Sequence, residues 1–131
     1  MDGALRSPGG DVETVYEAGD ALLICRFSGE IDVEGLARAR ALSAKLAADR
    51  VVRGVLIDVR HSRPAYGHAD FIESAEEFLA IFAPQRCAFV ATDDPARARQ
   101  VMLLETVGFP SAMRVRAFTD AVAARAWLCE R

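Results

Sequence analysis

Residues 51–59 (VVRGVLIDV) decide how this sequence folds. The run is short, rich in β-branched side chains and apolar nearly throughout, as is typical of a central strand covered on both faces. A polar, turn-rich loop is predicted at residues 60–68 (RHSRPAYGH), and a helix at residues 69–82. The helix carries its apolar side chains on one face at helical spacing. The strand, loop and helix together therefore predict a helix that packs on a parallel sheet.

Upstream of this unit, the sequence predicts a hairpin and a helix. Residues 12–17 and 21–27 are strand-like runs joined by the turn-forming residues 18–20, a spacing typical of two antiparallel strands. Asp32 is a good N-cap for a helix that the apolar spacing extends to about residue 49.

Downstream, two further strands alternate with two helices. Residues 86–92 and 113–118 predict the strands. Asp94, followed by proline, predicts the start of a helix that Gly108 ends in the left-handed conformation. A short final helix follows the capping pair Thr119-Asp120, and its inner side is predicted to consist of Val122, Ala126, Trp127 and Leu128.

The predicted order is β-β-α-β-α-β-α-β-α. Strands that alternate with helices over short connections favour parallel pairing with right-handed crossovers. The sequence thus predicts a single α/β domain at residues 11–131, with a mixed, mostly parallel sheet and an antiparallel N-terminal hairpin. The turn-rich residues 1–10 are predicted to be a loose leader.

The composition of the 131 residues excludes several classes of protein. With 52% hydrophobic and 27% charged residues, the chain is not intrinsically disordered. Its net charge of −3 and scattered basic residues predict no nucleic-acid partner. The absence of a long apolar run and of a signal-peptide pattern predicts a cytoplasmic protein without stable membrane insertion. The cysteines at positions 25, 87 and 129 have neither disulfide-framework nor zinc-site spacing.

Several short motifs resemble the SpoIIAA-like, or STAS/SEC14-type, domains of bacteria. They are residues 28–32 (SGEID), the strand end at 56–58 (LID), the strand 88–91 (AFVA) before Asp93, and the tail 114–120 (RVRAFTD) followed by AWL at 126–128. The resemblance implies a SpoIIAA-like fold over residues 12–131. It also implies a non-enzymatic regulatory domain that binds a protein partner or a small apolar ligand.

The sequence departs from this family at its phosphorylation motif. In anti-sigma-factor antagonists of this fold, an Asp-Ser-Ser/Thr-Gly element lies between the central strand and the next helix. Here residues 66–69 read YGHA, without Ser or Thr. Ser62 and Tyr66 are the hydroxyls of the loop, and each has a structural explanation, Ser62 as a turn residue and Tyr66 as a cover for the core edge. We therefore expect no switch driven by phosphorylation.

A binding site is expected beyond the carboxyl ends of the parallel strands. This edge is predicted to gather polar side chains from three strands and the connections that follow them. They are Asp58, His61, Ser62, Tyr66, His68, Thr92, Asp93, Thr119 and Asp120.

These residues do not form a recognisable catalytic or metal site. His61, His68 and Asp70 could approach one ion, but their spacing matches no known ligand pattern. Asp58 could be a base with a raised pKa, although pairing with Arg60 or Arg63 is favoured. Neither a phosphate loop nor a nucleophile with its base can be assembled from the local sequence. No cofactor, metal or enzymatic activity is predicted.

The helix at residues 69–82 separates the functional hypotheses. Its phenylalanines, Phe78 among them, give an apolar arc wider than one sheet contact needs, and a large contribution to the core explains most of it. Two functional hypotheses compete with that explanation: a pocket for an acyl chain or another small apolar molecule beneath the helix, or a homodimer or partner interface. A regulatory interaction domain is preferred, with a SEC14-type lipid or ligand carrier as the alternative.

Overall fold

The computed structural model describes residues 10–81 and 84–130, and within them strands and helices alternate after an initial hairpin. The elements are β1 (Gly10–Glu17), β2 (Leu22–Ile31), α1 (Val33–Ala47), β3 (Gly54–Pro64), α2 (His68–Ile81), β4 (Arg86–Val90), α3 (Pro95–Gly108), the 3₁₀ turn η2 (Phe109–Ser111), β5 (Arg114–Phe118) and α4 (Ala121–Leu128). The predicted order of strands and helices is confirmed.

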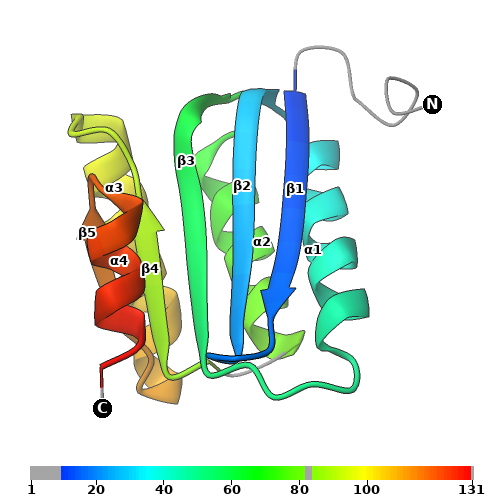
Figure 1. The fold of residues 1–131 in the computed structure, drawn as a ribbon. Helices are drawn as coiled ribbons and strands as arrows, with labels where there is room; N and C mark the ends of the chain where they lie inside the picture. The colour runs from blue at the N-terminus through cyan, green and yellow to red at the C-terminus, as the bar shows by residue number, and fades with distance from the viewer. Residues whose placement is uncertain (1–9, 82–83, 131) are drawn as a thin grey trace.

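The strands form one sheet in the order β1-β2-β3-β4-β5. β1 is antiparallel to β2, and β2, β3, β4 and β5 are mutually parallel, as predicted. Figure 1 shows α1, α2 and α3 behind the sheet and α4 in front of it, over the β4–β5 side. The front of β1 and β2 carries no helix in this view.

Two apolar layers explain why the central strands are apolar on both faces. Leu23, Val55 and Phe89 are buried under α1, α2 and α3. Their neighbours along the strands point the other way, so that Leu56 and Val90 pack against α4. The alternation follows from the two-residue period of a strand.

The boundaries of β3 differ from the prediction. The strand begins at Gly54 rather than Val51, whose side chain is 70% exposed, and it continues through Pro64 into the predicted loop 60–68. The extension exists because β2 is also longer than predicted, and its residues Ser28–Ile31 pair with residues 61–64. In this two-stranded extension exposed polar side chains alternate with Ile31 and Pro64, which line the apolar cavity under the helices. The extension therefore lacks the continuous apolar run that reveals the rest of β3 in the sequence.

The ends of two helices also differ from the prediction. Gly108 has a right-handed φ of −80°, and the left-handed residue is Ala112, with a φ of 57°, at the end of η2. At Gly108 the main chain approaches Met113 closely, because a Cβ here would lie 2.6 Å from Met113 Cε and 3.2 Å from Met113 Cβ. On α4 the buried residues are Ala124, Trp127 and Leu128. Val122 and Ala126 are exposed, so the predicted inner face was wrong at these two positions.

The N-terminal caps agree with the sequence. The Asp32 carboxylate accepts a hydrogen bond from Gly35 N at 2.9 Å, and the Asp94 carboxylate accepts one from Arg97 N at 3.0 Å. Asp120 caps α4 in the same way. α2 begins at His68, one residue before the predicted start of this helix.

Two predicted features fall on the limits of the described residues. The leader at residues 1–10 lies outside them except for Gly10, which begins β1, and Phe82 of the predicted helix also lies outside them. Among the described residues, no helix has the length and apolar character needed to cross a bilayer.

Candidate functional site

Arg97, a residue that the sequence reasoning did not single out, organises the carboxyl edge of the sheet. The cap at Asp94 starts α3 so that Arg97 turns inward, where its side chain is only 5% exposed. Its Nη2 donates to Val59 O at 3.0 Å, to Ser62 O at 2.7 Å and to Ser62 Oγ at 3.2 Å. These oxygens are neutral, so the buried guanidinium holds the end of β3 by charge-assisted hydrogen bonds rather than by an ion pair.

Gln100 extends this contact to the connection between β3 and α2. Arg97 Nη1 donates to Gln100 Oε1 at 2.7 Å, and Gln100 Nε2 donates to Tyr66 OH at 3.0 Å. The Tyr66 ring stacks on Phe71 of α2, with 6.2 Å between ring centroids. Burial raises the pKa of Tyr66, opposed by the hydrogen bond from Gln100. We call Val59, Ser62, Tyr66, Arg97 and Gln100 the Arg97 network.

The Arg97 network uses both hydroxyls of the connection for structure. Ser62 Oγ donates to Val59 O at 2.9 Å while accepting from Arg97. Tyr66 OH is held by Gln100. Three exposed basic side chains lie around this segment: Arg63 near the end of β3, opposite Glu30 of β2, and His68 and Arg99 at the starts of α2 and α3. We call Arg63, His68 and Arg99 the connection surface, in which Arg99 Nη1 lies 3.4 Å from His68 Nε2.

Asp58 lies on the opposite face of the sheet and is ion-paired. Its carboxylate accepts from Arg60 Nε at 3.0 Å, from Arg60 Nη2 at 2.8 Å and from Arg60 N at 3.1 Å. Burial pushes the pKa of Asp58 up, but the hydrogen bonds and charge of Arg60 outweigh it, so that the pKa is lowered. Asp58 is therefore a carboxylate ion-paired with Arg60, and its pKa is not raised as the pKa of a general base would be.

The sheet edge between the starts of α3 and α4 contains a hollow of about 380 Å³. It brings together four of the predicted residues, which are Thr92, Asp93, Thr119 and Asp120. Two of the acidic side chains here are engaged by neighbouring groups: Asp94 accepts from Thr92 Oγ1 at 2.8 Å, and Asp120 accepts from Ala123 N at 3.1 Å. The hydrogen bond from Thr92 and then that from Arg97 N lower the pKa of Asp94.

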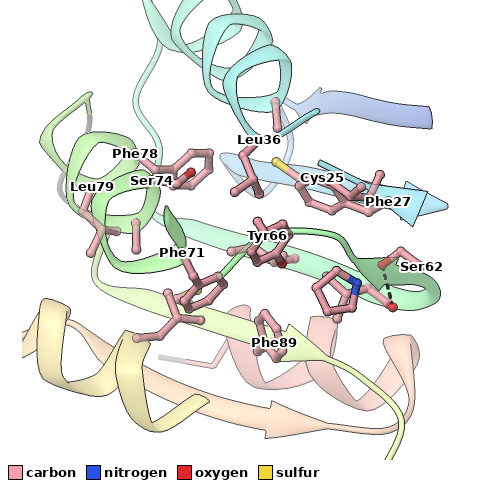
Figure 2. Close-up of a pocket in the computed structure, with 18 residues that line it drawn as sticks. Cys25, Phe27, Leu36, Ser62, Tyr66, Phe71, Ser74, Phe78, Leu79 and Phe89 are labelled. Atoms are coloured by element: carbon pink, nitrogen blue, oxygen red, sulfur yellow. Dashed lines mark hydrogen bonds between the residues drawn. The ribbon is translucent and has the colours of Figure 1, made fainter. Parts of the chain in front are cut away.

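A separate apolar cavity of about 60 Å³ lies between the sheet and the helices α1 and α2. Figure 2 shows Phe27, Tyr66, Phe71 and Phe78 around it, and Ser62 at one end with its hydrogen bond. Cys25 and Cys87 also line the cavity. Burial raises the pKa of Cys25 to about 11 and that of Cys87 to about 12. Both groups are thus unreactive thiols at neutral pH.

The predicted site is therefore divided among four places. Ser62, Tyr66 and Phe78 line the apolar cavity. The hollow between α3 and α4 is lined by Thr92, Asp93, Thr119 and Asp120. Asp58 and His61 line a polar hollow on the α4 side of the sheet, together with Arg26 and Ser28. His68 lies at the surface beside Arg99.

This division also separates the possible metal ligands. His61 and His68 occupy different surfaces, and Asp70 accepts a hydrogen bond from Gly67 N at 3.0 Å. Within residues 10–81 and 84–130, no three His, Cys, Asp or Glu side chains gather as an ion site requires.

The sequence does contain a signal that Arg97 and Gln100 are buried. Arg97, Gln100, Leu104 and Gly108 are the buried residues of α3, at intervals of three or four. Extending the apolar face of this helix backwards from Leu104 places Arg97 and Gln100 on its inner side. Their polar character hides them from a search for apolar periodicity.

Comparisons with known proteins identify the fold. No protein-family model matches the sequence, and no curated protein does. An anti-sigma factor antagonist from Mycobacterium paratuberculosis superposes with a TM-score of 0.63 at 18% identity, covering 92% of this chain and 96% of the other. An uncharacterised protein of the DUF3478 family from Shewanella loihica PV-4, with a SpoIIAA-like fold, gives 0.58 at 17% identity, over 92% and 94%.

A third solved structure is the Bacillus cell fate determinant SpoIIAA in its phosphorylated form. It has a TM-score of 0.54 at 13% identity, over 89% of this chain and 99% of the other. At these identities the likeness concerns the fold. The chain has a SpoIIAA-like fold, as the sequence motifs implied.

Proposed function

We propose that this protein is a non-enzymatic regulatory domain that binds another protein through its connection surface. The observation that carries the proposal is the Arg97 network, in which Arg97 and Gln100 of α3 hold the end of β3 and Tyr66 by hydrogen bonds. A segment held in this way positions His68 beside Arg99 before a partner binds, with Arg63 at the end of β3, which lowers the entropic cost of binding. The guanidinium groups of Arg63 and Arg99 favour a partner with an acidic surface.

Two further observations support an interaction domain over an enzyme. The groups that could serve in catalysis are occupied or neutral, since Asp58 is paired with Arg60 and the thiols of Cys25 and Cys87 have raised pKa values. The fold is also shared by an anti-sigma factor antagonist.

The proposed domain works without a phosphorylated hydroxyl at the start of α2. Gly67 and His68 stand there in place of Ser or Thr. A phosphate on Ser62 would have to displace the hydrogen bonds to Val59 O and from Arg97. Binding therefore does not depend on phosphorylation of this segment. The partner is recognised by charge and shape.

The alternative function, a carrier of a small apolar ligand, is favoured by the cavity under α2. Its volume of about 60 Å³ is well below the roughly 300–1,000 Å³ of pockets that hold drug-sized ligands. An acyl chain would thus require α2 to move away from the sheet. The carrier hypothesis predicts a molecule of lipid size in the purified protein.

Photo-crosslinking in the native host tests the interaction proposal. A photoreactive benzoylphenylalanine replaces His68 in one protein and Val122, which is 75% exposed on α4, in the matched control. We expect discrete crosslinked products from position 68 and a different, weaker pattern from position 122. The products should disappear when Arg63→Glu and Arg99→Glu are added. Equal products at both positions, or products that survive the charge reversal, would contradict the proposal.

A further inference from the structure

The outer edge of β5 presents main-chain groups that can accept another strand. Arg114 N donates to Gln85 O at 3.0 Å, and Phe118 O accepts from Ala91 N at 2.9 Å, so these two residues turn their main chain toward β4. Because direction alternates along a strand, the N–H and C=O of Val115 and Ala117 point away from the sheet. An edge of this kind is a template for strand addition.

The two edge strands of the described sheet carry opposite charges. β5 has the sequence RVRAF, with two arginines and no acid, and β1 has GDVETVYE, with three acids and no base. The register places Arg116 beside Ala88, which packs under α4, so Arg116 and Arg114 project from the α4 face. Their guanidinium groups lie over the rings of Phe118 and Trp127.

The acids of β1 project from this same face. Glu17 pairs with Arg125 of α4, and Glu13 lines the polar hollow that contains Asp58. Glu13 also pairs with Arg26 at 3.3 Å, but its side chain remains 65% exposed. A surface pair of this kind contributes little and exchanges readily, so the charge of Glu13 is accessible to a partner.

The helices beside the two edges expose apolar side chains on their outer sides. Met102 of α3 and Phe109, the first residue of η2, are 60% and 82% exposed. They are seven residues apart, and η2 directly continues α3, so both lie on one side of this helical segment. Phe109 lines a hollow with Arg114 and Val115, so this side lies beyond the β5 edge.

On α1 the exposed large apolar residues are Val33 at its start, 52% exposed, and Leu42 in its middle, 40% exposed. Arg40 points toward α2, because its Nη1 lies 3.1 Å from Glu77 Oε1. Leu42 follows two residues later and therefore lies on the other side of the helix, away from α2 and toward the β1 edge. Figure 1 shows α1 beside β1 at one end of the helical layer and α3 near β5 at the other.

We propose that β5 of one copy of this chain binds β1 of a second copy, so that the sheet continues from molecule to molecule. Antiparallel addition of β1 leaves the second copy in the same orientation as the first, which puts the acids of β1 and the arginines of β5 on one face. The other face brings Leu42 against Met102 and Phe109. Such a contact is head-to-tail and leaves one free edge at each end, so assembly is open-ended unless it closes into a ring.

Sedimentation velocity over rising protein concentration tests this assembly. We expect the wild-type mass to grow beyond that of a dimer and to fall again at high salt, which screens surface charges. The variants R114E/R116E and D11R/E13R should each be monomeric, because each places like charges across the contact. An equimolar mixture of the two should recover assembly, since acidic β5 then meets basic β1.

Two controls complete the experiment. The matched charge reversal E73R/E76R on exposed positions of α2 should leave assembly unchanged. Ala117→Pro removes an outward N–H without breaking a bond to β4 and should abolish assembly in a protein that circular dichroism shows to be folded. A wild-type monomer at all concentrations, a mixture that stays monomeric, or a variant that still dimerises alone would overturn the proposal.

Discussion

At the scale of single residues, a buried arginine with neutral acceptors is the least expected feature of this molecule. Arg97 contacts the main chain of β3 at Val59 and Ser62 from a helix that lies more than thirty residues further along the chain. Burial of a charge is costly unless hydrogen bonds replace water. Here the acceptors on β3 that replace water are two main-chain oxygens and one hydroxyl oxygen, and none of them is a carboxylate. The position of the connection thus depends on one side chain.

We expect Arg97→Ala to destabilise the fold by about 1–3 kcal/mol, because buried acceptors lose their donor. Urea unfolding followed by circular dichroism measures the change. Arg99→Ala, at an exposed position two residues away, is the matched control and should cost less than about 0.5 kcal/mol. Equal effects of the two substitutions would show that the Arg97 network does not support the connection.

The ion pair of Asp58 with Arg60 predicts a pH dependence of stability. The pKa of Asp58 is lowered in the folded protein from an ordinary value of 3.8. Its stabilising contribution is therefore complete above pH 3.8 and is lost as the pH falls through the lower folded pKa. Asp58→Asn should reduce the free energy of unfolding at pH 7, and the difference from wild type should shrink below pH 4. A difference that stays constant from pH 7 to pH 3 would contradict the ion-pair explanation.

At the scale of elements, the sequence predicted most of the fold because its signals are local. Asp32, Asp94 and Asp120 cap the helices that they were expected to cap. The end of β3 escaped prediction because residues 60–64 are polar and depend on pairing with distant residues of β2. The candidate site was less predictable for the same reason. Whether Ser62 and His61 face the cavity or the opposite side depends on the strand geometry and not on spacing to a fixed loop.

The cavity beneath α2 gives an element-scale test of the two functions. Ala75→Met places a flexible apolar side chain beside the cavity and should stabilise the protein by about 0.5–2 kcal/mol, as cavity filling commonly does. Thermal unfolding measures the gain, and Ala80→Met on the exposed side of α2 is the matched control. The interaction proposal predicts that neither substitution changes partner crosslinking at position 68. If Ala75→Met alone abolished crosslinking, the functional site would be the cavity and not the connection surface.

At the scale of the whole molecule, the fold separates its polar surfaces rather than assembling them. The connection surface lies at one edge of the sheet, the Asp58 ion pair lies on the α4 face, and the sheet ends in strands of opposite charge. An enzyme needs its groups to converge on one point. The interaction domain that we propose can use separate surfaces for different contacts.

The most direct test of this account is native mass spectrometry of the protein purified gently from its own host, compared with the R63E/R99E variant. We predict that the wild-type protein carries a polypeptide whose mass differs from that of this chain, that the variant does not, and that neither carries a covalent phosphate. A wild-type spectrum with a bound molecule of lipid size, or the same foreign polypeptide on both proteins, would contradict the proposal.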